Sequence, residues 1–385
     1  MHTLQICARC VTDSAVPGVK FDSLGECNYC RLHDLLDQSW PMGEAGHRTL
    51  NRLVEEIKAH GRGKPYDCVI GLSGGTDSTY LLYLAKELGL RPLAVHFDGG
   101  WNSEIAVHNI QKAVSHLDVD LYTYVVDWEE FKDVLVSYLK ASLPWADAPT
   151  DLAINATLYQ VAAKEGIRYI LNGSSFRTEG KMPTEWTYID ARTLKYVHRH
   201  FGSLDLKTFP NLTLSDFIYY NLVKRIRLAR PLNHIAYHKN DARSVLEKEL
   251  GWQYYGGHHF ESVYTRFAYA FWLPRKFGID KRKITHSALV RYGEMTREEA
   301  LNSLQTSPYP EEKIAEDVKY VIRKLDLTPD AFSKIMAAPP RKFTDYPSYY
   351  PFIQRMKGIT RPVLKRMLRW TPPLFLEMDV RKDSS

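Results

Sequence analysis

The chain has 385 residues and a net charge of +6, and its composition is ordinary for a globular protein. This length allows one large domain with additions, or two domains. No apolar run is long enough to cross a bilayer, and the first residues lack the basic and apolar regions of a signal peptide. We therefore expect a cytoplasmic protein without a transmembrane segment.

The positive charge is concentrated towards the carboxyl end. Residues 341–385 hold ten Lys and Arg against four Asp and Glu, which leaves the first 340 residues neutral. A basic tail can dock on a membrane, nucleic acid or an acidic partner, or it can be a solvated face. Because the body of the chain is neutral, no nucleic-acid partner is expected.

The chain is predicted to have three parts. Residues 1–42 are turn-rich, residues 43–240 alternate between strand and helix patterns, and residues 241–385 are mainly helical with a basic tail. The expected strands are 68–72, 93–97, 121–126, 169–171 and 227–232. The expected helices between them are 77–88, 103–117, 128–141 and 151–165. This alternation predicts an α/β fold with a doubly wound parallel sheet, in which ligands bind at the carboxyl ends of the strands.

A phosphate-binding loop is predicted between the first strand and the helix that follows it. Its residues are Ser73, Gly74, Gly75, Thr76, Asp77 and Ser78. Glycines let backbone N–H groups approach phosphate oxygens, and the helix start favours an anion. The loop lacks the Walker lysine and the dinucleotide fingerprint, which argues against ordinary γ-phosphoryl transfer. An acidic residue at such a site makes sense if Asp77 binds a Mg²⁺ ion carried by ATP. A plain glycine turn is the alternative.

This loop resembles that of the PP-loop ATP pyrophosphatases, a HUP-like α/β superfamily. The resemblance implies that ATP is cleaved between its α and β phosphates, so that an oxygen becomes adenylylated and is then displaced by nitrogen or sulfur. His96, Phe97 and Asp98, at the end of the second strand, resemble the adenine-side loop of the superfamily. Asn172 and Gly173 end the fourth strand and resemble its second nucleotide-facing turn. Taken singly, each would more often be an ordinary turn.

The four cysteines near the amino end predict a metal site. Cys7 and Cys10 form one C-x-x-C pair, Cys27 and Cys30 form another, and sixteen residues separate the pairs. Four thiolates at this spacing suit tetrahedral Zn²⁺ with no open position, so the site is expected to be structural. Disulfides are disfavoured in the cytoplasm, and an iron–sulfur cluster is the other alternative.

The fifth cysteine bears on which nucleophile the enzyme uses. PP-loop enzymes that thiolate tRNA need further cysteines for sulfur chemistry, and here only Cys68 remains, inside an apolar strand. A built-in glutaminase would also need a nucleophilic cysteine. Ammonia from solution or from a separate glutaminase subunit is therefore favoured. A tRNA-modifying enzyme of the thiolation or lysidine type stays open as the rival.

A closer resemblance covers residues from about 7 to about 304. It is carried by both cysteine pairs and by segments 72–78, 97–102, 172–175, 256–262 and 273–282. Together these resemble the N-acetyl sugar amidotransferases of the WbpG/PseA type, which act in lipopolysaccharide O-antigen and other surface-polysaccharide biosynthesis. The resemblance implies that an acetamido group on a nucleotide-linked sugar becomes an acetamidino group. The implied sugar is a diacetamido uronic acid or a nonulosonic acid, and the implied cofactors are ATP, Mg²⁺ and structural Zn²⁺. Ammonia would come from a HisH-like glutaminase with a HisF-like cyclase-type partner.

Catalytic roles are predicted for four residues. Asp77 is expected to act with the nucleotide, and Glu261 to orient or deprotonate ammonia. A carboxylate placed at a helix start for the helix dipole is the alternative for Glu261. Arg177 and Lys181 are candidates for holding pyrophosphate or a sugar carboxylate, with solvated surface as their alternative. Four more candidates for contact with ligand phosphates have the same alternative: His258, His259, Arg266 and Lys281.

Overall fold

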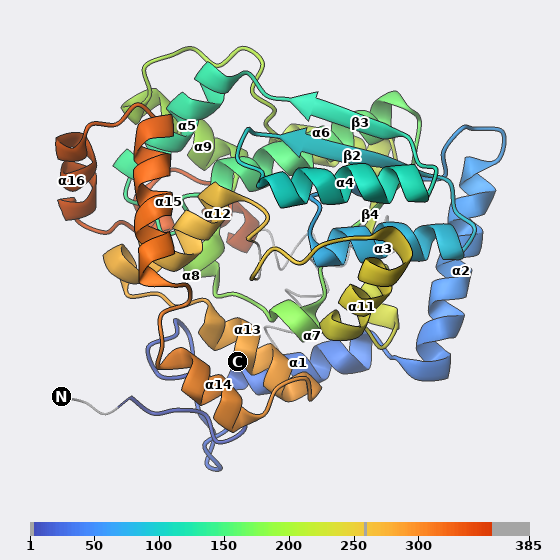
Figure 1. Ribbon diagram of the computed structural model, residues 1–385, viewed down its shortest axis with the longest axis horizontal. Coiled ribbons are helices and arrows are strands. Elements are labelled where there is room, and N and C mark those ends of the chain that lie inside the picture. Colours follow the sequence, from blue (N-terminus) through green and yellow to red (C-terminus); the bar gives the residue numbers. More distant parts are fainter. Residues whose placement is uncertain (1–3, 258–259, 356–385) are drawn as a thin grey trace.

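The computed structural model describes residues 4–257 and 260–355. At its centre lies a five-stranded parallel sheet in the order β3-β2-β1-β4-β5 (Figure 1). The strands are β1 Cys68–Gly71, β2 Pro92–Asp98, β3 Leu121–Val125, β4 Tyr169–Leu171 and β5 Arg227–Ala229. The chain runs from β1 outward to β3 and then returns to β4 on the other side of β1. The carboxyl ends of β1 and β4 therefore form the topological switch point, where doubly wound sheets bind ligands.

Burial on both faces explains the apolar sequence of the central strands. Val69 packs with residues of α6 Ala148–Lys164, whereas Cys68 and Ile70 pack on the opposite face. The edge strand β3 behaves differently, because Leu121 and Val125 are exposed. The fifth strand is shorter than the predicted 227–232, since Pro231 begins a 3₁₀ turn and cannot donate to the ladder.

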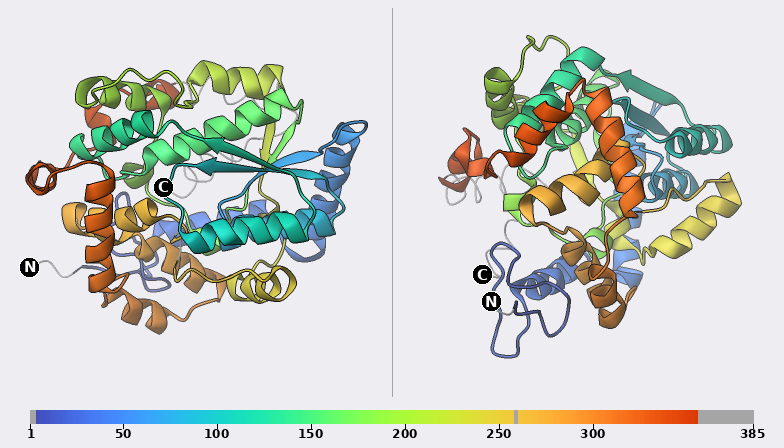
Figure 2. Two further views of the ribbon diagram at one scale, coloured as in Figure 1. Left: turned by 45° about the horizontal axis from the view of Figure 1, so that its top comes forward. Right: turned by 60° about the vertical axis from the view of Figure 1, so that its left-hand side comes forward.

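Helices cover both faces of the sheet, as Figure 2 shows. On one face lie α2 Gly43–Gly61, α3 Thr76–Glu87, α4 Glu104–His116 and α11 Lys239–Leu250. On the other lie α6 Ala148–Lys164, α10 Leu214–Ile218 and the π-helical η1 Tyr219–Val223. The α/β fold and its doubly wound parallel sheet are thus as predicted. The expected domain boundary at residue 240 falls within α11.

The carboxyl-terminal helices share a core with helices of the α/β part. They are α12 Val263–Phe267, η3 Ala268–Phe277, α13 Arg282–Tyr292, α14 Arg297–Leu304, α15 Glu311–Lys324 and α16 Pro329–Ala337. Buried side chains from η3, α15 and α16 pack with α5 Trp128–Lys140 and α9 Ala191–Phe201. This shared core fixes the carboxyl-terminal helices against the sheet, and with them the segment that reaches the phosphate loop.

The amino-terminal unit, which we call the ribbon (residues 4–27), leads into α1 Asn28–Ser39. Its buried residues pack with α1, with α7 Phe176–Glu179 and with α13. The remaining short elements are α8 Thr184–Thr187, η2 Pro231–His234 and η4 Phe343–Asp345. Within the described part of the chain, no helix combines the length and the apolar character needed to span a membrane.

Candidate ATP site and metal centre

The predicted phosphate loop lies at the switch point between β1 and α3. Gly74 has φ +79°, and a Cβ at this position would lie 2.3 Å from the carbonyl oxygen of Ala106 in α4. Only glycine therefore lets the loop pack so closely. Gly75 precedes α3 without a side-chain cap of its own, and N–H groups at a helix start favour an anion. The hydroxyls of Ser73 and Ser78 lie 3.1 Å apart within the loop.

Two further segments close around the loop. A Cβ on Gly173, after β4, would lie 2.7 Å from the backbone oxygen of Asp77, so this turn packs directly on the start of α3. The backbone N–H of Thr76 donates to the hydroxyl of Tyr255, at 3.2 Å. Burial raises the pKa of Tyr255, and nearby Glu261 adds to this effect, so the phenol stays protonated. The fourth-strand turn and the phosphate loop are therefore brought together, as the sequence predicted.

Asp77 has two partners that sequence reasoning missed. Its carboxylate accepts hydrogen bonds from the Tyr237 hydroxyl at 2.5 Å and from the Lys239 ammonium at 3.0 Å. Burial opposes the charge on Lys239, but Asp77, Glu179 and Glu261 outweigh it and raise the lysine pKa. Lys239 thus places a cation beside the phosphate loop from outside it.

A signal for Lys239 was present in the sequence. The residue is the first of α11, where the positive end of the helix dipole disfavours a cation. A lysine in such a position needs another stabilising partner, and Asp77 supplies it.

Glu261 reaches the phosphate loop from a distant part of the chain. The segment that carries it runs beside the end of β2: the N–H of Ser103 donates to the Glu261 carbonyl, and the N–H of Val263 donates to the Trp101 carbonyl. The side chain of Ser73 lies 3.4 Å from the Glu261 carboxylate. A carboxylate beside an anion site calls for a cation between them. Lys239 is one such cation, and Asp77 with Glu261 would suit a Mg²⁺ ion carried by the nucleotide.

The residues predicted for the adenine side of the nucleotide lie in different surroundings. His96 is buried between the two strand ends, where Nδ1 contacts the Leu72 carbonyl at 2.9 Å and Nε2 contacts Asn102 at 3.0 Å. Phe97 departs from the prediction, because its ring packs in the core against Phe131. A side chain that alternates to the buried face of a strand cannot also face the nucleotide.

Two other residues predicted for nucleotide binding bind their own turns. The Asp98 carboxylate accepts the N–H of Gly100 at 2.8 Å. The Asn172 side chain accepts the N–H of Ser174, also at 2.8 Å. Both side chains shape the loops beside the site.

The structure corrects the role predicted for Arg177. Its side chain is 1% exposed, and its guanidinium donates to Asp37, to the Trp40 carbonyl and to the Asn233 carbonyl. These bonds join α1, the turn after it and η2. The guanidinium is therefore committed to the scaffold and is unavailable for pyrophosphate. Lys181 follows α7 and is partly exposed.

The other residues predicted to contact ligand phosphates do not lie together. Arg266 makes a two-pronged ion pair with Asp317 of α15, at 2.6 and 2.7 Å, which gives it a structural role. Lys281 is neither helical surface nor solvent-facing, because it is 6% exposed. His258 and His259 lie outside the described residues.

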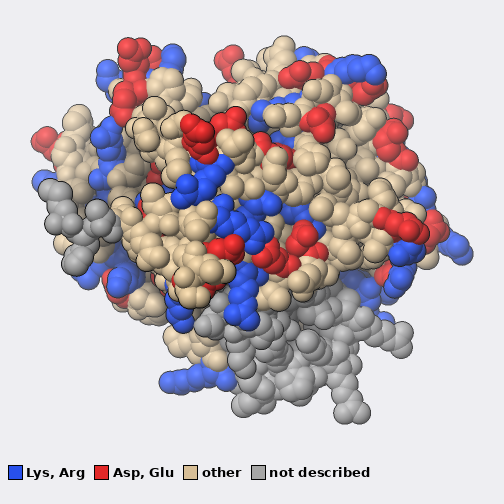
Figure 3. All heavy atoms as spheres, turned by 90° about the horizontal axis from the view of Figure 1, so that it is seen from below, with Lys and Arg blue, Asp and Glu red and all other residues tan. Residues whose placement is uncertain are grey.

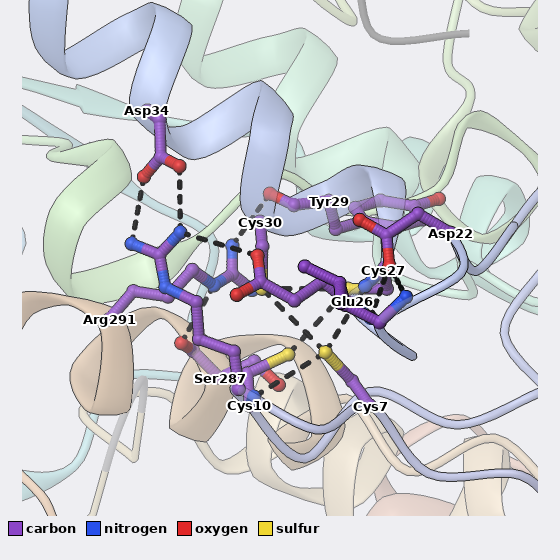
Figure 4. A network of polar contacts seen from close by, with 12 residues as sticks. Cys7, Cys10, Asp22, Glu26, Cys27, Tyr29, Cys30, Asp34, Ser287 and Arg291 are labelled. Carbon is purple, nitrogen blue, oxygen red and sulfur yellow. Dashed lines mark hydrogen bonds and ion pairs between the residues drawn. The ribbon is translucent and has the colours of Figure 1, made fainter.

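The four ribbon cysteines form a cluster that could hold a metal ion, here called the metal centre. Their sulfur atoms converge in the ribbon (Figure 4), with Sγ–Sγ separations of 3.7, 3.7 and 3.8 Å. Zn–S bonds of about 2.3 Å in a tetrahedron place the sulfurs about 3.8 Å apart, so the spacing fits Zn²⁺. A disulfide needs about 2.05 Å and is excluded. The backbone N–H of Cys27 donates to the Cys7 sulfur at 3.2 Å, which stabilises a thiolate.

The metal centre is fastened to the carboxyl-terminal helices. Arg297 donates to the carbonyls of Cys7 and Cys10, and Ser287 accepts the N–H of Val11. Since all four ligands are buried cysteines, no position is open for substrate. The centre therefore holds the ribbon against α13 and α14.

Comparison with known families separates the chain into two matched regions. Residues 261–359 match the family described as "LPS biosynthesis protein WbpG-like, C-terminal domain". Residues 67–144 match the queuosine biosynthesis protein QueC, a PP-loop family. Together the two matches support WbpG-like membership of the PP-loop superfamily. The QueC-like region contains the phosphate loop, and the WbpG-like region begins at Glu261, whose carboxylate lies against that loop. Membership and loop geometry together support an ATP-using enzyme.

Curated relatives match only short stretches. A tRNA(Ile)-lysidine synthase from Chlamydia pneumoniae is 37% identical over 67 residues, which cover 17% of this chain and 21% of that protein. The uncharacterized protein MJ1599 from Methanocaldococcus jannaschii is 33% identical over 90 residues, which cover 22% of this chain and 32% of that protein. The WbpG-like chain thus spans between a fifth and a third of the length of these relatives.

Solved structures also give distant matches. One is a predicted tRNA methyltransferase subunit from Methanocaldococcus jannaschii, with 14% identity, a TM-score of 0.28, and coverage of 47% of this chain and 75% of that one. Another is NMN synthetase from Francisella tularensis, with 15% identity, a TM-score of 0.28, and coverage of 61% and 94%.

Proposed function

We propose that this WbpG-like protein is an ATP-dependent amidotransferase that converts an acetamido group of a nucleotide-linked sugar into an acetamidino group. The substrate class is a diacetamido uronic acid or a related sugar of lipopolysaccharide O-antigen biosynthesis. The observation that carries the proposal is the contact between Ser73 and Glu261. It joins the ATP-binding loop to the first residue of the WbpG-like region. The family-specific part of the chain therefore contributes a side chain to the nucleotide site.

The proposed reaction has two steps. The acetamido oxygen attacks the α-phosphorus of ATP and releases pyrophosphate, which forms an O-adenylylated imidate. Ammonia then attacks the imidate carbon, and AMP leaves. An amide oxygen is a weak nucleophile, so the first step depends on positioning and on stabilisation of developing charge. The uncapped start of α3, Lys239 and a Mg²⁺ ion beside Asp77 are suited to stabilise the phosphates.

Ammonia is proposed to come from a separate glutaminase of the HisH-like type with a HisF-like partner. Within the described residues, each ribbon cysteine belongs to the metal centre, and Cys68 is buried in β1. Burial raises the pKa of the Cys68 thiol, which makes it a poor nucleophile. The chain therefore offers no cysteine suited to glutamine hydrolysis or sulfur transfer among its described residues.

The test is an assay with ATP, Mg²⁺, ammonium carrying heavy nitrogen, and a panel of nucleotide-linked diacetamido uronic acids. We expect AMP, pyrophosphate, and a sugar in which one oxygen is replaced by labelled NH. When the acetamido oxygen carries a heavy isotope, that isotope should appear in AMP, because the oxygen leaves with the adenylyl group. Asp77→Ala should abolish all three products. ADP formation, or a heavy-oxygen label that stays out of AMP, would contradict the proposal.

A tRNA-modifying PP-loop enzyme is the rival, since a tRNA(Ile)-lysidine synthase shares a short stretch of sequence. On the face shown in Figure 3, basic and acidic side chains are interspersed, and a tRNA-binding surface usually needs a continuous basic area. AMP release that depends on tRNA and not on any sugar would favour the rival.

A further inference from the structure

Lys281 occupies an unusual position next to the ATP site. It precedes α13, its side chain is 6% exposed, and its ammonium lies 3.8 Å from the ring centroid of Trp145 and 4.0 Å from that of Tyr269. Across residues 4–257 and 260–355, no hydrogen bond or ion pair engages this ammonium. A buried lysine normally has such a partner, because an isolated buried charge is costly. The two aromatic faces compensate for only part of that cost.

Carboxylates surround the lysine from two other helices. Asp147 precedes α6, is 3% exposed, and accepts hydrogen bonds from Thr150 at 2.5 Å and Thr265 at 2.6 Å. Asp151, one turn later, accepts the indole N–H of Trp145 at 2.6 Å. Glu179 approaches from α7. Three acidic groups therefore act on one lysine, so the surroundings of Lys281 are acidic overall and favour a cation.

The titration of these groups follows from their burial. Burial lowers the pKa of Lys281 to about 7, although Asp151, Asp147 and Glu179 act in the opposite direction. Burial also raises the pKa of Asp147 to about 7, and Asp151 adds to the effect. The Tyr269 hydroxyl, from η3, has its pKa raised by burial and by Asp151, so it stays neutral. At neutral pH, a substantial share of Lys281 is therefore an uncharged amine able to accept a proton.

The cluster adjoins the phosphate loop. Thr265, which binds Asp147, stands four residues after Glu261, and the charge of Glu261 acts on Tyr269 of the cluster. The charge of Glu179 acts on both Lys239, beside Asp77, and Lys281. Charged side chains therefore link the candidate ATP site to Lys281, which lies at the start of α13.

We infer that Lys281, Trp145, Tyr269, Asp147 and Asp151 form the site that receives the nitrogen nucleophile, with Lys281 as its proton acceptor. The inference rests on the proposed amidotransferase function and deepens it. Carboxylates and aromatic faces recognise a small ammonium-like group, and the lysine's own ammonium already lies between two rings in this environment. The acidic surroundings disfavour an anionic occupant such as the sugar carboxylate.

The step transfers one proton from the attacking ammonia to Lys281 and releases AMP. Neutral ammonia attacks the imidate carbon, the new C–N bond forms, and the C=N π electrons move onto the sugar nitrogen. The added nitrogen then carries an excess proton, which passes to the uncharged Lys281 amine. The C–O bond to AMP breaks, AMP leaves with that electron pair, and the amidine C=N bond forms. Lys281 afterwards returns its proton to solvent.

Two half-reactions separate the inference from the proposed function. Exchange of labelled pyrophosphate into ATP in the presence of sugar reports adenylylation without ammonia, and amidine formation reports the whole reaction. For Lys281→Met, we expect exchange within about threefold of the wild type and a loss of about 100-fold in amidine formation, the usual effect of losing a general base. In the wild type, kcat/KM per neutral ammonia should fall below about pH 7 as Lys281 becomes protonated. The variant should lack this dependence.

Lys281→Arg decides between chemistry and structure. Arginine keeps the positive charge and the aromatic contacts but cannot lose its proton. If Lys281 accepts a proton, the arginine variant should be as impaired as the methionine variant. If Lys281 only holds α13 in place, arginine should restore activity, and that result would overturn the inference.

Lys276→Met serves as the matched control. Lys276 also faces an aromatic ring, at 5.3 Å from Trp272, but its ammonium donates to three carbonyls at the end of α16. This variant should lose thermal stability and keep the pH profile. An equal loss of pyrophosphate exchange and amidine formation in Lys281→Met, or a raised KM for sugar alone, would contradict the inference. If the wild type forms no amidine from any sugar, the proposed function itself has failed.

Discussion

Replacing Arg177 tests whether this residue serves the scaffold or the ATP site. Arg177→Met removes three hydrogen bonds, at 2.6 to 2.7 Å, and leaves the carbonyls of Trp40 and Asn233 without donors. Hydrogen bonds to a charged group contribute about 1.5–3 kcal/mol each. Asp37 is 46% exposed and can turn to solvent, so its share is small. Because two buried carbonyls lose their donors, we expect the free energy of unfolding to fall by about 3–5 kcal/mol, similar to the effect of breaking a buried ion pair.

The assay compares thermal unfolding with nucleotide binding. A loss of this size should lower the unfolding midpoint by about 6–10 °C, at roughly 2 °C per kcal/mol. Below both transitions, calorimetric titration with a non-hydrolysable ATP analogue should give an affinity within about threefold of the wild type. Arg177→Lys keeps the charge but not the planar fork, so it should lose about half as much stability. An unchanged midpoint with a tenfold loss of affinity would refute the structural role and restore Arg177 as a phosphate ligand.

Other changes have equally definite expected outcomes. Between about pH 7 and pH 10.5, Lys281 is protonated in the unfolded chain and deprotonated in the folded chain, so its contribution to the free energy of unfolding rises with pH. Lys281→Met should remove that rise, as measured by thermal unfolding at several pH values. An unaltered dependence of stability on pH would refute the assignment. Gly173→Ala places a Cβ 2.7 Å from the Asp77 backbone oxygen, so it should cost about 1–3 kcal/mol and weaken binding of the ATP analogue. The control Gly63→Ala meets no atom within 4 Å and should leave that binding unchanged despite strain at φ +74°; equal binding by both variants would contradict the packing argument. Cys10→Ser should release the metal and make the ribbon sensitive to protease, and atomic absorption of the wild type should find one zinc per chain rather than iron.

Local sequence patterns were enough to predict the sheet, the place of the Ser73–Ser78 loop between β1 and α3, and the convergence of the four cysteines. In each, the residues that act together are close in sequence or follow a strand–loop–helix pattern with a direct physical meaning. The loop from Ser73 to Ser78 is a continuous segment, and the cysteine pairs carry their own spacing. Placing Asn172 and Gly173 near the loop required only the rule that parallel strands end at one edge.

The side chains that converge from distant helices were harder to predict. Whether Arg177 meets phosphate or carbonyl groups depends on where α1 and η2 pack, and neighbouring residues carry no information about that. Phe97 was misplaced because an apolar residue at a strand end can face either the core or the ligand. Tyr237 and Lys239 were missed because their relation to Asp77 is set by the docking of α11 against α3.

In the proposed amidotransferase, the placement of Glu261 would link a general phosphate loop to a specific reaction. The loop and the start of α3 bind phosphate through backbone groups, which any nucleotide-using member of the superfamily can share. Specificity has to come from side chains added around that loop. In this chain they come from residue 261 onward, where Glu261 contacts the loop, Thr265 binds Asp147, and Lys281 stands between two aromatic rings. Because α13 is also fastened to the metal centre, the ribbon fixes the same helix that begins beside Lys281.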